Sequence, residues 1–311
     1  MTVIDLHSFK PTSAPLETVL CLGNFDGVHI GHQALISQTV EQKNRLSDTH
    51  PNIKSGVGFF RRAPHELITG KTSAHLTVLE DKLLIFSRLG LDVAFIYDYS
   101  DIGNLSPEQF VTDVLKKECG CIFAVCGYNF RFGRGASGDA ELLSKLTNGN
   151  AYTVEQIKLD GMSVSSSAIR KLISSGDIEK ANAMLGRPYS IRAVVLHGKK
   201  LGRRLGIPTV NQSFSSELAI PEKGIYISQT YIDGVPFKSV SNVGIRPSVE
   251  DGAGINCETH ILGFEGDLYG CELTVEFLKR LREEIKFDSI DALTNQIKKD
   301  IEQPKEYFNK K

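Results

Sequence analysis

The order of secondary structure expected along this chain changes once, near Gly186-Arg187-Pro188, and this change limits the fold more than any other feature. Before it, short apolar runs expected as strands alternate with helix-like segments. Such alternation is typical of a parallel sheet covered by helices on both faces. After it, the candidate elements are strands joined by segments rich in Gly, Pro, Asn and Asp, which is typical of a compact antiparallel barrel. The 311 residues are enough for two such domains.

The expected elements fall into two sets. In the first part, strands are expected over 19–23, 56–60, 93–97, 122–126 and 152–157, and helices over 33–42, 79–89, 107–117 and 172–184. In the second part, strands are expected over 191–197, 224–231, 237–243, 256–263 and 272–277, with one closing helix over 289–302. In the first part we expect ligands at the carboxyl ends of the parallel strands.

The composition excludes several classes of protein. The formal net charge of −1 argues against a nucleic-acid binder that relies on bulk positive charge. No apolar run reaches the roughly 18 residues of a membrane span, and the N-terminus lacks the basic start and apolar centre of a signal peptide. The six cysteines form no C-x-x-C pair, which favours reduced thiols in a cytoplasmic protein over a zinc site.

The stretch Leu22–His32 reads L-G-N-F-D-G-V-H-I-G-H and joins an expected strand to a helix that begins near His32. A strand, a glycine turn and a helix N-terminus bring backbone N–H groups and the helix dipole to one point, where they favour an anion. The imidazoles of His29 and His32 add donors for phosphate oxygens. The alternative is that one histidine caps the helix and the other packs against it.

Two further segments carry polar groups suited to phosphate. Val164–Ile173 reads V-S-S-S-A-I-R-K-L-I, in which at least one serine is expected to cap a helix while Arg170 projects from its first turn. Hydroxyls, helix N–H groups and a guanidinium together bind a triphosphate well. Gly127–Gly133 reads G-Y-N-F-R-F-G directly after an expected strand. The alternative for this second segment is a turn with two core aromatic residues.

Together these three segments resemble the nucleotidylyltransferase superfamily, and more closely the adenylyltransferase module of bacterial bifunctional riboflavin kinase/FAD synthetases. The resemblance implies a Rossmann-like domain in which the phosphate of FMN attacks the α-phosphate of ATP and pyrophosphate leaves. It implies that His29 and His32 stabilise charge on the phosphates, and that Ser166, Ser167 and Arg170 hold the leaving β- and γ-phosphates. Further nucleotide contacts are expected at Gly23, Asn24, Phe25, Gly27, Gly31 and Asn129.

This half departs from the pattern of the family it resembles at three places. Most members have an acidic residue followed by P-H-P, whereas this chain has Phe60-Arg61-Arg62-Ala63-Pro64. Position 129 is Asn where many members have Asp, and Ser167 stands where Thr is usual. Arg61 and Arg62 place two cations beside the expected nucleotide pocket. They hold a phosphate, mark a weakened or altered adenylyltransferase, or are solvated surface residues.

The second half carries a different set of polar residues. His197–Asn211 reads H-G-K-K-L-G-R-R-L-G-I-P-T-V-N, a basic glycine-rich loop followed by an extended segment. Thr209 and Asn211 alternate with Val210, so their side chains share one face. A hydroxyl and an amide carbonyl are hard oxygen ligands suited to Mg²⁺. The alternative for the loop is an ordinary surface loop without a ligand.

A single carboxylate lies inside an apolar strand of the second half. Glu258 is part of I-N-C-E-T-H-I-L-G-F and, in a strand, shares a face with Asn256 and His260. The residues between them face the opposite side. A carboxylate in such a strand is either a functional group or a member of an exposed strand face.

These segments resemble the riboflavin kinase module of the same bifunctional family, through G-x-P-T-x-N, N-V-G-I-R-P, E-T-H with G-D-L-Y-G, and R-x-E-x-K-F after the last expected strand. The resemblance implies that Glu258 activates the terminal ribityl hydroxyl of riboflavin for attack on the γ-phosphate of ATP. It implies Thr209 and Asn211 as ligands of Mg²⁺ and the nucleotide. It also implies that Gly198, Lys199 and Gly202 cover the phosphates and that Arg282 and Glu284 lie near the flavin.

The resemblance covers nearly the whole chain and predicts an FMN adenylyltransferase domain over residues 1–186 and a riboflavin kinase domain over 187–311. We therefore expect a cytoplasmic enzyme, monomeric or a weak homo-oligomer, that makes FMN from riboflavin and FAD from FMN with ATP and Mg²⁺. We expect no nucleic-acid or membrane partner. The alternatives are a riboflavin kinase with a weakened or altered adenylyltransferase half, adenylyl transfer to another acceptor, which the kinase half disfavours, and a non-catalytic flavin-binding regulator.

Overall fold

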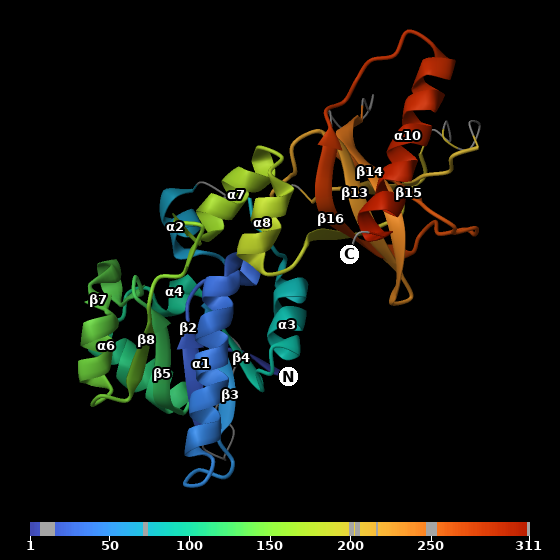
Figure 1. The fold of residues 1–311 in the computed structure, drawn as a ribbon. Coiled ribbons are helices and arrows are strands. Elements are labelled where there is room, and N and C mark those ends of the chain that lie inside the picture. Colours follow the sequence, from blue (N-terminus) through green and yellow to red (C-terminus); the bar gives the residue numbers. More distant parts are fainter. Residues whose placement is uncertain are drawn as a thin grey trace. The chain divides into compact units, whose positions relative to one another are not determined.

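The computed structural model describes residues 1–6, 16–70, 74–198, 202, 206–215, 217–246 and 254–309. The chain divides into two compact units, Met1–Ser166 and Ser167–Lys311, which are described separately (Figure 1). Within the described ranges, no helix is long and apolar enough to cross a membrane.

The first unit is built on a six-stranded sheet in the order β1-β4-β3-β2-β5-β8, and every neighbouring pair is parallel. The chain moves outward from β2 through β3 to β4 and then returns to place β5 on the other side of β2. The order therefore reverses between β2 and β5, and open α/β sheets bind ligands at the carboxyl ends of strands beside such a reversal. The strands are β1 (Thr2–Asp5), β2 (Thr18–Leu22), β3 (Lys54–Phe60), β4 (Val93–Tyr97), β5 (Cys121–Gly127) and β8 (Ala151–Val154).

Helices cover both faces of this sheet, as the alternation of elements predicted. In β2, Val19 and Cys21 pack into a core shared with α1 and α3, whereas Leu20 and Leu22 pack into a core shared with η2 and α6. This two-sided burial explains why the strand is apolar throughout. The helices are α1 (Ile30–Leu46), α2 (Pro64–Thr69), α3 (Leu79–Arg88), α4 (Tyr99–Ile102), α5 (Pro107–Gln109), η2 (Phe110–Glu118, with π-helical winding) and α6 (Ala140–Leu146).

Short elements complete the first unit. Two single-turn 3₁₀ segments, η1 (Asp26–Val28) and η3 (Arg134–Ala136), lie in loops, and two small ribbons pair β6 (Arg131–Phe132) with β7 (Gly138–Asp139) and β9 (Lys158–Leu159) with β10 (Met162–Ser163).

The second unit contains a six-stranded antiparallel sheet in the order β11-β16-β13-β14-β15-β12. A bridge between Leu196 and Asn211 joins its two edges, so the sheet forms a nearly closed barrel, as predicted. Helix α10 lies against β13 and β14, and α8 is joined to β16 where Asn182 Nδ2 donates to the carbonyl of Phe277 at 2.8 Å. The elements are α7 (Ser166–Ser174), α8 (Ile178–Leu185), β11 (Tyr189–Val194), β12 (Val210–Ser213), β13 (Gly224–Ile232), β14 (Val235–Arg246), β15 (Gly254–Ile261), β16 (Glu272–Arg282) and α10 (Ile290–Asn309).

The structure corrects several expected elements. The helix expected over 172–184 is two helices, because Gly176 takes a left-handed conformation (φ 79°) between α7 and α8. Helix α1 begins at Ile30, two residues before His32. Strand β16 continues past Phe277 to Arg282, so the segment expected to follow the last strand begins inside it. Strand β1 and helix α6 were not expected from the sequence.

Candidate active sites

The glycine turn after β2 lies at the edge where the order of the parallel sheet reverses. The last residue of β2, Leu22, pairs in register with Cys126 near the end of β5. The segments Gly23–Gly31 and Gly127–Gly133 therefore leave neighbouring strands at the same edge of the sheet. Two of the three segments singled out from the sequence meet here for a topological reason.

The backbone of the first turn is strained. Phe25 (φ 53°), Gly27 (φ 80°) and Val28 (φ 40°) all adopt left-handed conformations. For non-glycine residues such conformations cost about 1–3 kcal/mol each, and they persist only where the surrounding structure enforces them. The ring of Phe25 is fully buried and meets Phe86 edge-on at 5.5 Å between centroids, which anchors the turn. The whole residue is buried, and its carbonyl accepts from the Val28 N–H at 3.2 Å, so Phe25 holds the shape of the turn.

The histidine pair combines a capping role with a defined ring orientation. His29 is the N-cap of α1, where its Nδ1 accepts from the His32 N–H at 3.3 Å, and the two imidazoles stack with centroids 3.6 Å apart. Because Nδ1 accepts, the proton of a neutral His29 resides on Nε2, which makes Nε2 a donor. A Cβ on Gly31 would lie 3.2 Å from the His29 ring, so a glycine there lets the ring lie close to the start of the helix.

The other predicted residues of this half are distributed as follows. Ser166, the last residue of the first unit, donates from Oγ to the carbonyl of Asp26 in the glycine turn at 2.9 Å. Ser167 and Arg170 follow on α7, where Arg170 Nη2 donates to Ser167 Oγ at 3.3 Å. Asn129 is exposed in the turn after β5. The amides of Gly23 and Gly27 donate to the Gly58 carbonyl (3.3 Å) and Thr77 Oγ1 (3.2 Å).

Arg61 occupies a structural position at the end of β3. Its N–H donates to the Tyr97 carbonyl at 2.9 Å, and its guanidinium binds the carboxylates of Asp5 and Asp98, the latter at 3.6 Å from Nε. Arg61 thus ties together the carboxyl ends of β1, β3 and β4. Both Arg61 and the neighbouring Arg62 are exposed, but the guanidinium of Arg61 is paired with two carboxylates.

In the barrel, strand register aligns three of the predicted residues. Asn211 pairs with Glu258, Glu258 with Asn242, Asn242 with Ile225, and Ile225 with Arg282. Residues directly opposite each other in antiparallel strands share a face. One row therefore crosses five strands and carries Asn211, the exposed Glu258 and Arg282. Sequence reasoning did not single out Asn242, although it lies in the noted N-V-G-I-R-P segment.

Asn256 joins the members of this row. Its side chain is on the same face as Glu258, as predicted, and it is only 5% exposed. Its Nδ2 donates to Asn211 Oδ1 at 3.1 Å and to Glu258 Oε1 at 3.5 Å. Within the described residues, Oδ1 of Asn256 and Oδ1 of Asn242 are buried without a hydrogen-bond partner. Unsatisfied buried oxygens of this kind favour a site that is completed by a ligand or water.

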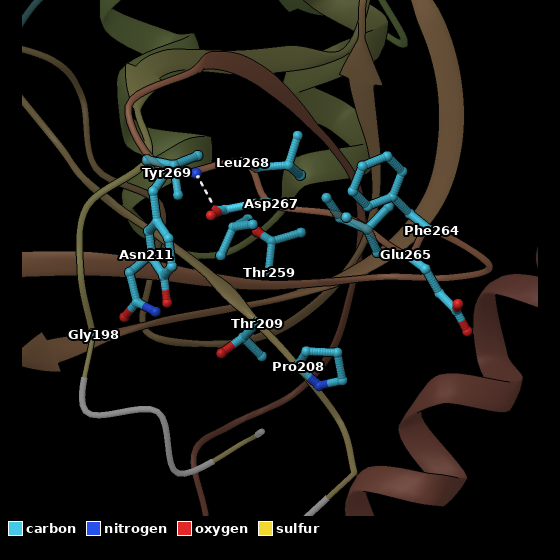
Figure 2. Close-up of a pocket in the computed structure, with 14 residues that line it drawn as sticks. Gly198, Pro208, Thr209, Asn211, Thr259, Phe264, Glu265, Asp267, Leu268 and Tyr269 are labelled. Carbon is cyan, nitrogen blue, oxygen red and sulfur yellow. Dashed lines mark hydrogen bonds between the residues drawn. The ribbon is translucent and has the colours of Figure 1, made fainter. Parts of the chain in front are cut away.

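A cavity of about 280 Å³ opens at the end of the barrel (Figure 2). Gly198, Pro208, Thr209 and Asn211 line one side, and the loop Phe264–Tyr269 lines the other. Apolar residues, including Val195 and Ile261, form much of the remaining wall. A mostly apolar cavity with a few polar groups at one side suits a small organic ligand such as a nucleotide.

Glycines permit the close packing around these polar groups. A Cβ on Gly198 would lie 2.5 Å from Asn211 Nδ2, and one on Gly202 would lie 2.4 Å from the Ile207 carbonyl oxygen. The predicted contact Lys199 lies outside the described residues. No cluster of three or more His, Cys, Asp or Glu suited to a metal occurs in the described part of the chain.

Of the two residues predicted near the flavin, Arg282 forms the other end of the row and Glu284 follows two residues later. Arg282 binds Asp300 of α10, with Nη2–Oδ2 at 2.6 Å and Nε 3.2 Å from both carboxylate oxygens. Gln296 Nε2 donates to Asp300 Oδ1 at 2.9 Å. A Cβ on Gly244 would lie 2.5 Å from Glu284 Oε1, so this carboxylate packs directly on β14. Neither Asp300 nor Gly244 was singled out from the sequence.

Comparison with known proteins covers both units. A family model described as riboflavin kinase matches residues 185–308, and one described as FAD synthetase matches residues 12–168. A Pseudomonas fluorescens protein named bifunctional riboflavin kinase/FMN adenylyltransferase is 34% identical over 303 residues, covering 96% of this chain and 95% of its own. A Bacillus subtilis (strain 168) protein of the same name is 32% identical over 314 residues, covering 97% and 96%.

Among solved structures, one described as a macrolide-efflux protein from Streptococcus pneumoniae matches with a TM-score of 0.87 and 27% identity. The match covers 98% of this chain and 99% of that one.

Proposed function

The chain belongs to the family of bifunctional riboflavin kinase/FMN adenylyltransferases, and we propose which of its residues carry each reaction. The enzyme phosphorylates riboflavin to FMN and adenylylates FMN to FAD, with ATP as the co-substrate of both steps. We assign the adenylyltransferase to residues 1–186 and the kinase to residues 187–311. The limits of the two family models, at 168 and 185, support a boundary in this region.

In the kinase reaction, Glu258 acts as the general base. Its carboxylate accepts the proton of the terminal ribityl hydroxyl while that oxygen forms a bond to the γ-phosphorus of ATP. The bond from this phosphorus to the β,γ-bridging oxygen breaks, and ADP leaves. A positioned base contributes about 10²–10⁴-fold to such a step. The observation that carries this assignment is the register row, which places Glu258 opposite Asn211 and beside Asn256.

ATP occupies the cavity between Gly198 and the loop Phe264–Tyr269, with its phosphates toward Thr209 and Asn211. These two residues fit Mg²⁺ because they offer neutral oxygens, and Asn256 fixes the orientation of the Asn211 amide oxygen. Mg²⁺ binds few protein oxygens and takes further ligands from phosphate and water. When bound, it supplies positive charge that neutralises phosphate oxygens.

The flavin lies toward Arg282 and Glu284. Arg282 is held in place by Asp300 of α10, so its guanidinium forms a fixed edge of the site. The proposed phosphate contacts also include Lys199 and Gly202. They belong to the glycine-rich loop that follows Gly198 in the chain.

In the adenylyltransferase reaction, a phosphate oxygen of FMN forms a bond to the α-phosphorus of ATP. The bond from that phosphorus to the α,β-bridging oxygen breaks, and pyrophosphate leaves. Catalysis consists of positioning and charge stabilisation, with no covalent intermediate. His29, through Nε2–H, and His32 donate to the phosphate oxygens, and Ser166, Ser167 and Arg170 hold the leaving phosphates. The remaining nucleotide contacts are Gly23, Asn24, Phe25, Gly27, Gly31 and Asn129.

The position of Arg61 bears on the strength of this second activity. Its guanidinium is bound by Asp5 and Asp98, so it does not add an unpaired cation to the nucleotide site. The ion pairs give a structural reason for Arg61, whereas Arg62 of the same segment is exposed.

Two variants test the assignment by separating the reactions. Glu258→Gln should lower FMN formation from riboflavin at least about 100-fold and leave FAD formation from added FMN intact. His29→Ala should lower FAD formation from added FMN and leave FMN formation from riboflavin intact. Glu272→Gln, an exposed carboxylate elsewhere in the barrel, is the matched control. FMN and FAD are quantified separately, and normal FMN formation by Glu258→Gln contradicts the assignment.

We further propose a cytoplasmic enzyme, monomeric or weakly self-associating, that needs neither a nucleic acid nor a membrane. All six cysteines are free thiols, which supports a reducing compartment.

A further inference from the structure

One buried cation lies beside the adenylyltransferase turn without a role in the mechanism above. Lys82, on α3, is only 8% exposed. Its Nζ donates to the carbonyl oxygen of Asn24 at 3.3 Å and lies 5.1 Å from the centroid of the Phe59 ring. Burying an ammonium group is costly unless it is paired and hydrogen-bonded. A lysine at this position therefore calls for a structural or functional reason.

The surroundings compensate part of that cost. Burial lowers the pKa of Lys82 below its ordinary value, although the charges of Asp26 and Glu66 oppose the shift. Asp26 is itself fixed, because its Oδ1 accepts from the Leu76 N–H at 2.8 Å. Glu66 is largely buried, with Oε1 3.7 Å from His75 Nε2. The ammonium thus belongs to a charged cluster built around the first residues of the turn.

Lys82 contacts the residue directly before the strained segment of the turn. Asn24 directly precedes Phe25, the first of the left-handed residues. A second contact comes from the same segment of the chain, because Thr77 Oγ1 accepts from the Gly27 N–H at 3.2 Å. With the bond from the Leu76 N–H to Asp26, the segment Leu76–Lys82 therefore contacts the turn at three points. It also binds the Asn24 carbonyl oxygen, a negative dipole end that would repel phosphate if it faced the ligand.

We propose that Lys82 is a positioning residue for FMN adenylylation, which holds the Asn24 carbonyl and thereby the left-handed turn in the conformation that receives the phosphates of ATP. The proposal rests on the proposed function, in which His29 and His32 follow this turn and carry the reaction. Lys82 acts through the backbone of Asn24 and contacts no substrate.

The test uses the full chain and three variants. Lys82→Met keeps the length of the side chain but removes the charge and the donor, whereas Lys82→Arg keeps both. Lys116→Met is the matched control, because Lys116 Nζ also donates to a backbone carbonyl, that of Leu146 at 3.2 Å, on the exposed surface. For each variant, kcat and KM for ATP are measured for FAD formation from FMN, and FMN formation from riboflavin is measured in the same preparation.

We expect Lys82→Met to lower kcat/KM for ATP in FAD formation about 100-fold, the effect of a misplacement of about 1 Å. A displaced turn raises the KM for ATP, whereas a partly unfolded population lowers only kcat. FMN formation should be unchanged, Lys82→Arg should recover most of the loss, and Lys116→Met should resemble wild type. An unchanged KM in Lys82→Met, equal loss of both activities, or no recovery in Lys82→Arg overturns the proposal.

His29→Ala distinguishes this failure from that of the proposed function. If His29→Ala loses FAD formation while Lys82→Met keeps a normal KM for ATP, the site is correct and the role of Lys82 is wrong. If His29→Ala forms FAD normally, the proposed adenylyltransferase site is wrong, and the inference about Lys82 is then wrong as well.

Discussion

Replacing Asp300 by alanine should loosen α10 from the barrel and disturb the edge of the kinase site where we propose that the flavin lies. Asp300 is 5% exposed and accepts from Gln296 as well as from Arg282. The Arg282 side chain is 18% exposed. Removing one partner of a buried ion pair costs about 3–5 kcal/mol, because the other charge remains buried and unpaired. We expect a loss of stability at the lower end of this range, about 3 kcal/mol, because Arg282 Nη1 keeps its hydrogen bond to the Glu283 carbonyl at 2.8 Å.

The assay is thermal unfolding of the full chain, with the KM for riboflavin as the second readout. For a domain of this size, about 3 kcal/mol lowers the melting temperature by roughly 6–12 °C. Glu302→Ala is the control on the same helix, because Glu302 is exposed and pairs with Lys305 at 2.8 Å. Such a surface pair contributes less than about 1 kcal/mol. Equal melting temperatures for Asp300→Ala and Glu302→Ala would refute the reasoning, as would an unchanged KM for riboflavin.

The remaining predictions concern thiols, acid stability and the nucleotide cavity. Cys271 is exposed and the other cysteines are buried, with burial raising the pKa of the Cys21 thiol to about 12. A thiol reagent at neutral pH should therefore modify one cysteine per folded chain, and the Cys271→Ser variant should not be modified. Rapid modification of several thiols in the folded protein would contradict this prediction. Burial alone would raise the pKa of Asp92, but hydrogen bonds from Ser55, with help from Lys43, hold it below the ordinary 3.8. The ionised group thus stabilises the fold above that pH and ceases to do so as the pH falls through the lower folded pKa. Asp92→Asn should lower the free energy of unfolding at neutral pH, and the difference from wild type should shrink progressively below about pH 4. A difference in unfolding free energy that does not vary with pH argues against this role of Asp92. Gly198→Ala should raise the KM for ATP in FMN formation about tenfold, because its Cβ displaces Asn211, and should spare FAD formation; an unchanged KM means that Asn211 does not contact the nucleotide.

Local patterns in the sequence predicted much of this architecture. The apolar run before Gly23 and the glycines after it are short-range signals, because strand, turn and helix start follow from neighbouring residues. The same holds for the face shared by Asn256 and Glu258, which follows from the two-residue period of a strand. The change from alternating elements to strands alone separated the α/β unit from the barrel. The family resemblance then assigned a chemistry to each.

Tertiary structure decided which distant groups meet. Asn211 and Glu258 are opposite each other only because of the register of β12 and β15, and a slip of one residue would turn one of them to the other face. The partners of Arg61 and Arg282 lie on other elements, so no local pattern reveals that both guanidiniums are already bound. Nothing in the sequence distinguishes Lys82 from an ordinary surface lysine of a helix. It becomes a buried cation on the nucleotide turn only when α3 packs against that turn, because burial and charge compensation depend on the whole fold.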